Sequence, residues 1–299
     1  MKRDNIDRVK TLIIEFIKIM EDSLSKEDLI MIINNFNTLN IKFKNYKITN
    51  FLFLDNTVGG YNPLNNTLML DINNFESTIY HELFHVASSK NYLNKILISG
   101  FHLNKISLNN SKHTRSIGIG INEGYTQYLA EKYFSNKKYI MSAYRYQVNV
   151  AKLIEEIIGE YKMQSLYFHA NLMGLINELS FYNDYDKVME FLTQLDFLHR
   201  KLSYTNINLK EKNTIINIFC KVHVFLIETY LYKLLEEIKI YNLTEEQFNI
   251  KVLNFIEQIP IAVESKKVLY DEILTHELIE KTIERICITN DRKDVVKII

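Results

Sequence analysis

Cysteine, proline and glycine are all scarce in this sequence of 299 residues. The two cysteines, Cys220 and Cys287, lie far apart and outside any metal-binding spacing, which argues against a disulfide framework and is compatible with a reducing compartment. Only Pro63 and Pro260 occur, glycine numbers 8, and the sequence contains no linker, repeat or low-complexity tract that would separate independent domains. We therefore expect parts that pack tightly together.

An excess of charge of either sign is missing as well. Lysine plus arginine and aspartate plus glutamate each total 36, so the formal net charge is zero. A balanced chain has no overall attraction to nucleic acid or to an anionic membrane. We expect neither of them as a partner.

Long uncharged apolar runs are also absent from the sequence. The amino terminus has an apolar run at residues 11–14, but Glu15 and Lys18 interrupt it and no small-residue cleavage site follows, which indicates an amphipathic helix rather than a signal peptide. No stretch reaches the roughly 18 to 20 residues that a membrane span requires. We expect a soluble, cytoplasmic protein.

The first half of the chain predicts helices followed by strands. Hydrophobic residues make up 47% of the sequence, enough for a full core in one large domain or two packed subdomains. Apolar residues at helical spacing predict two helices before residue 38, and alternating segments predict strands near 41–48, 51–54 and 67–71, with turns at Gly59-Gly60 and Asn65-Asn66 and a hairpin within 96–108. The helical apolar residues are Val9, Leu12, Ile13, Phe16, Ile17 and Met20, then Leu29, Ile32 and Ile33.

The second half predicts almost only helices. Beyond about Met141 the expected helix ends are Gly159 and Pro260, and a capping box runs from Thr244 to Gln247. The order of elements predicts an α+β fold, in which an N-terminal half with a small mixed sheet is followed by an all-α C-terminal subdomain. We place the two subdomains at 1–140 and 141–299.

The segment 81–85, His-Glu-Leu-Phe-His, is the main candidate for chemistry. Asn73 as the N-cap, followed three residues later by Glu76, predicts the start of a helix that runs to about Ser89. Its apolar flank consists of Ile79, Leu83 and Val86. On such a helix His81 and His85 stand one turn apart on one face, so that both can bind one Zn²⁺, and Glu82 lies beside that face.

A third ligand is expected from the segment Gly120 to Leu129, which contains Asn122-Glu123-Gly124. His-Glu-x-x-His followed by Asn-Glu-Gly on a second helix resembles the gluzincin clan of zinc metallopeptidases. The resemblance covers roughly residues 59–133 and implies a zincin-like fold for 1–140. It also implies that the metal ligands are His81, His85 and Glu123, and that Glu82 is the general base. The alternative reading of Glu123 is an acidic residue that stabilises the first turn of its helix.

Gln127 follows Glu123 by one helical turn and faces the same way. The clan uses an acidic residue at this offset to hold the first histidine ligand, so the resemblance implies that Gln127 accepts the ring N–H of His81. A neutral amide fixes the tautomer without adding negative charge, and a surface glutamine is the alternative reading. Gly124 is expected to allow a close backbone approach.

Peptide hydrolysis is the chemistry that these residues predict. Zinc would lower the pKa of its bound water toward about 7, and Glu82 would take the proton and pass it to the leaving amine. The oxyanion usually needs a Tyr or His donor as well. Our first candidate is Tyr146, followed by Tyr144, His223 and His113, with a core role as the alternative, above all for His223.

We therefore expect a zinc-dependent peptidase, a hydrolase acting on a peptide or protein. An extended substrate would pair with strand 67–70, unless that strand is an ordinary sheet edge. A catalytically silent zinc- or protein-binding module on a zincin scaffold is the alternative, against which Glu82 argues because zinc binding alone does not need that carboxylate. A helical interaction protein without metal is the third possibility.

Overall fold

A computed structural model describes residues 2–44, 59–92, 96–105, 116–136, 143–203, 207–241, 243–265, 268–271 and 273–289. The chain divides into two compact units. The first unit is Met1–Ile117, Tyr125–Ala143 and Gln164–Leu172, and the second unit is Gly118–Gly124, Tyr144–Met163 and Met173–Ile299. Helix α5, Ile119–Phe134, supplies its first turn to the second unit and the rest of its length to the first.

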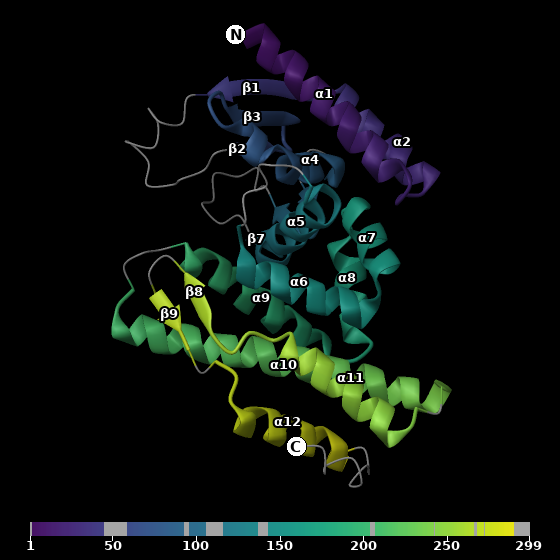
Figure 1. Cartoon of the computed structure of the whole chain (residues 1–299), viewed down its shortest axis with the longest axis vertical. Coiled ribbons are helices and arrows are strands. Elements are labelled where there is room, and N and C mark those ends of the chain that lie inside the picture. Colours follow the sequence, from purple (N-terminus) through teal and green to yellow (C-terminus); the bar gives the residue numbers. More distant parts are fainter. Residues whose placement is uncertain are drawn as a thin grey trace. The chain divides into compact units, whose positions relative to one another are not determined.

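The first unit opens with the two predicted helices, α1 (Lys2–Glu21) and α2 (Lys26–Asn37). They pack against each other, and α2 also packs against α4 (Figure 1). Ser25 caps α2 by accepting the backbone N–H of Asp28 at 3.1 Å. The buried apolar residues of α1 are Val9, Leu12, Phe16 and Met20, which confirms the face predicted from their spacing.

A three-stranded mixed sheet follows, with strand order β1-β3-β2. β1 (Asn40–Lys44) runs parallel to β3 (Thr67–Asp71), and β2 (Gly59–Asn62) runs antiparallel to β3.

The turn predicted at Gly59-Gly60 is wrong, because both residues belong to strand β2 and pair with β3. The strand 67–70 is not an exposed edge either, since β3 is paired on both sides and the edge next to α4 belongs to β2 among the described strands. Residues 45–58, with the strand predicted at 51–54, lie outside the described part of the chain.

A short turn leads from the sheet to the helix that carries the candidate motif. A 3-10 turn, Phe75–Ser77, precedes α4, Ile79–Ala87, whose N-cap is Thr78. The predicted cap at Asn73 is wrong, because Asn73 takes part in a turn in which its backbone N–H donates to Asp71 at 3.2 Å. Glu76 pairs instead with Arg8 at 2.8 Å.

A second sheet of the first unit has the order β4-β5-β6-β7. Its strands are β4 Ser89–Tyr92, β5 Ile96–Ser99, β6 His102–Lys105 and β7 Ser116–Ile117. Gly100 opens the predicted hairpin between β5 and β6 with a φ of 54°, which glycine adopts without strain. Residues 106–115 lie outside the described residues, and α5 begins three residues before the expected Asn122.

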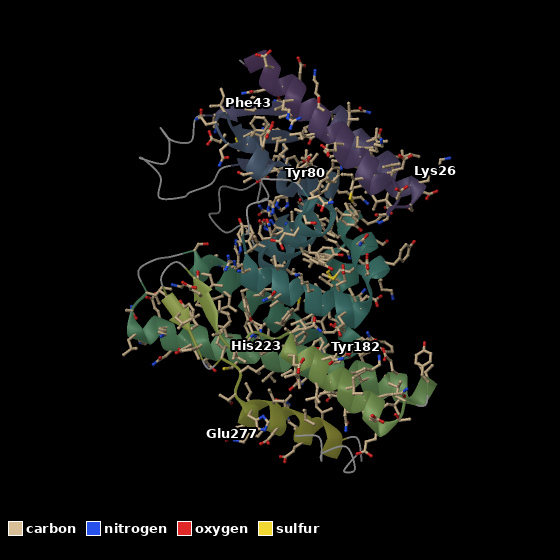
Figure 2. The ribbon with its side chains drawn as sticks, viewed as in Figure 1. Lys26, Phe43, Tyr80, Tyr182, His223 and Glu277 are labelled. Atoms are coloured by element: carbon tan, nitrogen blue, oxygen red, sulfur yellow. The ribbon has the colours of Figure 1, made fainter. Side chains whose placement is uncertain are left out.

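Tyr80 links three helices in the core of the first unit (Figure 2). Its ring stacks on Phe134 of α5 with centroids 4.0 Å apart. Its hydroxyl donates to Glu15 of α1 at 3.1 Å. These contacts fix α4 between α1 and α5.

Most of the second half is helical, which confirms the α+β class. The helices are α6 Arg145–Ile158, α7 Glu160–Phe168, α8 Leu172–Ser180, α9 Tyr185–Leu202, α10 Leu209–Tyr241, α11 Glu245–Glu257 and α12 His276–Thr289. Gly159 ends α6 with a φ of 93°, and the predicted capping box of Thr244 and Gln247 opens α11. The expected all-α character needs one correction, because β8 (Val263–Ser265) and β9 (Val268–Tyr270) form a hairpin.

The long helix α10 of the second unit contains a long apolar segment. Its segment Leu209–Ile238 is, among the described residues, the one helix long and apolar enough to cross a membrane by length and composition. The structure buries 61% of its apolar window, as expected of a core helix. Phe219, Val222 and Leu226 are among its fully buried side chains.

Candidate metal centre

Helix α4 presents the three residues of the motif. Its predicted apolar flank, Ile79, Leu83 and Val86, is at most 1% exposed, and His81 is the one residue of α4 that is not buried. His81 and His85 then lie on another side, one turn apart, with Glu82 next to them. Glu82 and His85 are 7% and 8% exposed.

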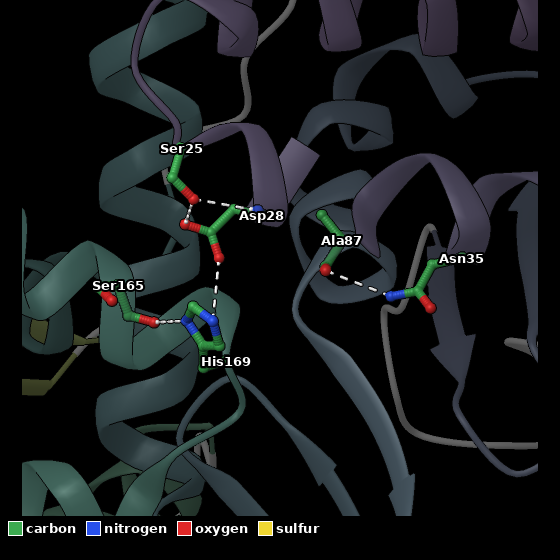
Figure 3. A network of polar contacts seen from close by, with 6 residues as sticks. All are labelled: Ser25, Asp28, Asn35, Ala87, Ser165 and His169. Atoms are coloured by element: carbon green, nitrogen blue, oxygen red, sulfur yellow. Dashed lines mark hydrogen bonds and ion pairs between the residues drawn. The ribbon is translucent and has the colours of Figure 1, made fainter. Parts of the chain in front are cut away.

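The carboxyl end of α4 is held firmly by side chains of the first unit. Ser89 and Ser99 both donate their hydroxyls to the carbonyl oxygen of His85, at 2.7 and 3.1 Å. Asn35 of α2 donates its amide to the carbonyl of Ala87 at 3.3 Å (Figure 3). These bonds satisfy carbonyl groups that a helix end leaves without partners, and they fix the backbone of the second histidine.

The imidazole rings of His81 and His85 point their Nε2 atoms at each other, 3.1 Å apart. Two nitrogens that share one tetrahedral zinc ion at about 2.0 to 2.1 Å lie about 3.3 Å apart, so the observed spacing fits a common ion. His81 Nδ1 lies 3.0 Å from the carbonyl oxygen of Gln127 and carries the proton of that bond. In neutral His81 the lone pair is therefore on Nε2, the atom that faces His85.

The third candidate ligand, Glu123, comes from α5. One ligand atom from each of His81, His85 and Glu123 lies within 4.8 Å of the others, so the three residues could hold a metal ion. Two imidazoles and a carboxylate are a donor set typical of catalytic zinc. The residues therefore fit the expected metal.

The first turn of α5 is anchored within the second unit. The buried carboxylate of Asp196, on α9, accepts the backbone N–H groups of Gly118 at 2.9 Å and Gly120 at 2.8 Å. Burial raises the pKa of Asp196, while the N–H groups of Gly120 and Gly118 and the charge of Arg200 oppose the rise. Asp196 thereby caps the helix that carries Glu123.

Two glycines in the same turn allow this close packing. A Cβ at Gly120 would lie 2.6 Å from the carbonyl oxygen of Leu195, and one at Gly124 would lie 2.3 Å from that of Gln147. Both neighbours are backbone atoms, which cannot rotate away. The predicted close approach at Gly124 is present, and its partner is the backbone of α6.

Glu82 lies close to the edge strand β2. A Cβ at Gly59 would lie 3.4 Å from Oε1 of Glu82 and 3.1 Å from the hydroxyl of Thr78. A Cβ at Gly60 would meet nothing within 4 Å. Of these two glycines, only Gly59 lies against α4, tightly at Thr78 and in ordinary contact with the Glu82 carboxylate.

Tyr146 and His223, two of the predicted oxyanion donors, lie in the core of the second unit. Tyr146 is 3% exposed, and the centroid of its ring lies 4.6 Å from that of Phe219 and 5.8 Å from that of His223. Its hydroxyl has no hydrogen-bond partner in the described part of the chain. These contacts are those of core residues, and a catalytic role for Tyr146 stays a prediction that they do not support. His113 lies outside the described residues.

His199 is a residue near Glu123 that the sequence did not point to. Burial lowers the pKa of His199, and the negative charge of Glu123 opposes the shift. Tyr144, another predicted donor, places its ring 5.5 Å from that of His199 and is 37% exposed. In the sequence His199 is one polar residue at the end of an amphipathic helix, and no motif marks it.

Comparison with known proteins adds no assignment. No protein-family model, no curated protein and no solved structure matches the chain. A functional conclusion therefore has to come from the residues of the candidate centre.

Proposed function

We propose that the protein is a zinc-dependent peptidase of the gluzincin type. The observation that carries the proposal is the pair of Nε2 atoms of His81 and His85, 3.1 Å apart, with a carboxylate of Glu123 within reach of both. A zinc ion bound there would supply a Lewis acid that polarises a carbonyl and makes a water molecule acidic near neutral pH. The proposed substrate is a peptide or protein.

Each residue of the centre has a distinct part in this proposal. His81, His85 and Glu123 bind the ion, and Gln127 orients His81. The carboxylate of Glu82 accepts the proton of the attacking water and delivers it to the leaving nitrogen. Because Glu82 is 7% exposed, little bulk water competes for that carboxylate.

Separate substitutions of Glu82 and Glu123 distinguish the loss of peptide cleavage from the loss of zinc binding. Glu82→Gln should keep stoichiometric zinc and lower the rate of peptide cleavage by about 100-fold or more, because the general base is lost. Glu123→Ala should weaken zinc binding more than the about 10- to 100-fold loss that is typical of partners outside the ligand set. Zinc content is measured by elemental analysis and cleavage by mass spectrometry of an unstructured peptide pool.

Glu76→Gln is the matched control, since Glu76 is a partly exposed carboxylate of the turn before α4 that pairs with Arg8. It should change neither readout. A wild-type protein that binds zinc and cleaves no peptide in the pool would favour the silent metal-binding module. Equal cleavage by wild type and Glu82→Gln would exclude Glu82 as the base.

A further inference from the structure

Gln127 is hydrogen-bonded on both sides of its amide. Its carbonyl oxygen faces Nδ1 of His81 at 3.0 Å, and its NH₂ group donates to a carboxylate oxygen of Glu131 at 3.0 Å. Gln127 and Glu131 stand one turn apart on α5, and Gln127 is 2% exposed. The three side chains thus form a chain that ends at a proposed metal ligand.

We infer that Glu131 is a positioning residue, which acts on His81 through the amide of Gln127 and selects the tautomer of His81 that can bind metal. A carboxylate only accepts hydrogen bonds, so Glu131 requires the NH₂ side of the amide to face it. The carbonyl side is then turned to His81, Nδ1 carries the proton, and Nε2 keeps its lone pair.

Loss of Glu131 would free the amide to rotate by half a turn. The NH₂ group would then face Nδ1 of His81 and favour the tautomer with the proton on Nε2, in which the nitrogen that faces His85 has no lone pair for a metal ion. The burial of Gln127 leaves little room for water to replace Glu131. At position 127 this chain has a neutral amide in place of the acidic residue of the gluzincin clan. Glu131, one helical turn later, therefore supplies the carboxylate, and it acts on the His81 ring through Gln127.

The tautomer of His81 in the metal-free protein is the most direct test. We expect the ¹⁵N chemical shifts of its ring to report a proton on Nδ1 in the wild type and a mixture of tautomers in Glu131→Ala. Glu131→Lys places a donor at the same position, so it should turn the amide around and shift the population further toward the proton on Nε2. Either variant suffices if the other fails to fold.

Zinc affinity, measured by competition with a chromophoric chelator, is the second readout. It should fall about tenfold in Glu131→Ala, within the range known for residues that orient metal ligands. The double variant Gln127→Glu/Glu131→Ala brings a carboxylate directly to His81 and should recover most of the loss. Lys132→Ala, the neighbour on α5, is the matched control and should bind zinc like the wild type.

The inference rests on the proposed function only for its metal, and the two can fail separately. Unchanged His81 tautomer and unchanged zinc affinity in both Glu131 variants would overturn the role of Glu131, whatever the peptidase assay gives. A wild type that binds no zinc would overturn the proposed function, while the tautomer measurement would still decide on Glu131.

Discussion

At the scale of single residues, the approach of β2 to the proposed base can be tested at Gly59. Gly59→Ala adds a methyl group 3.1 Å from the hydroxyl of Thr78, the N-cap of α4, so Thr78 must move by a few tenths of an ångström, while Glu82 at 3.4 Å is in ordinary contact. We expect kcat/KM for peptide cleavage to fall roughly 3- to 10-fold, because small misplacements of a catalytic group are costly. Zinc affinity should stay within twofold of wild type.

Gly60→Ala is the control for this prediction, since its Cβ meets nothing within 4 Å. Both variants change the same strand and the same residue type. Only the one at Gly59 should lower cleavage. Equal rates in the two variants would show that the distance between Gly59 and Glu82 does not matter for the reaction.

The residues of the candidate centre differ in how well the sequence reveals them. His81 and His85 are predictable because the helical repeat itself places them on one face, and Gln127 follows by the same rule from Glu123. Glu131 obeys that spacing as well, but its role depends on which way the amide of Gln127 points. Asp196 and His199 are not predictable, because only tertiary folding brings them to the first turn of α5.

At the scale of elements, α5 is the part on which the proposed centre depends most. Glu123, Gln127 and Glu131 follow one another at four-residue spacing along it, and Asp196 holds its first turn. Asp196→Asn leaves one oxygen for two N–H groups and turns an NH₂ group toward the other. We expect unfolding in urea to require about 1 to 3 kcal/mol less free energy, and zinc binding to weaken with the loosened turn.

Asp184→Asn offers a matched control for that change. Asp184 is also an aspartate of α9, at its N-cap, but makes no side-chain cap hydrogen bond. Its exchange should cost far less stability and leave zinc binding unchanged. If the two variants are equally stable, the carboxylate of Asp196 does not secure the start of α5.

The elements themselves were predictable where one local pattern dominates. α1 and α2 follow from their apolar spacing, and α11 from its capping box. β2 is not predicted because Gly59-Gly60 favours a turn locally, whereas pairing with β3 makes both residues part of a strand and the close hydroxyl of Thr78 favours glycine at position 59. The central position of β3 is likewise a property of sheet order, which alternation in one strand does not encode.

At the scale of the whole molecule, buried His223 should make stability depend on pH. His223 lies on α10 (Figure 2) and is 0% exposed. The rings of Tyr146 and Phe219 lie beside its own. Burial lowers the pKa of His223 from 6.5 to about 3. Between these two values the unfolded chain binds a proton that the folded protein does not, so acid favours the unfolded state.

The free energy of unfolding should therefore fall as the pH is lowered from about 6.5 toward 3, by up to about 1.4 kcal/mol per pH unit from this group alone. Metal-free protein is used, so that loss of a bound ion does not add a pH dependence of its own. His223→Leu places an apolar side chain of similar size in the core. The free energy of unfolding of this variant in urea should depend less on pH, by up to about 1.4 kcal/mol per pH unit. His276→Gln changes a histidine on α12 whose side chain is 70% exposed, and it should keep the wild-type slope. Parallel pH profiles for wild type and His223→Leu would mean that His223 is protonated in the folded protein as readily as in the unfolded chain.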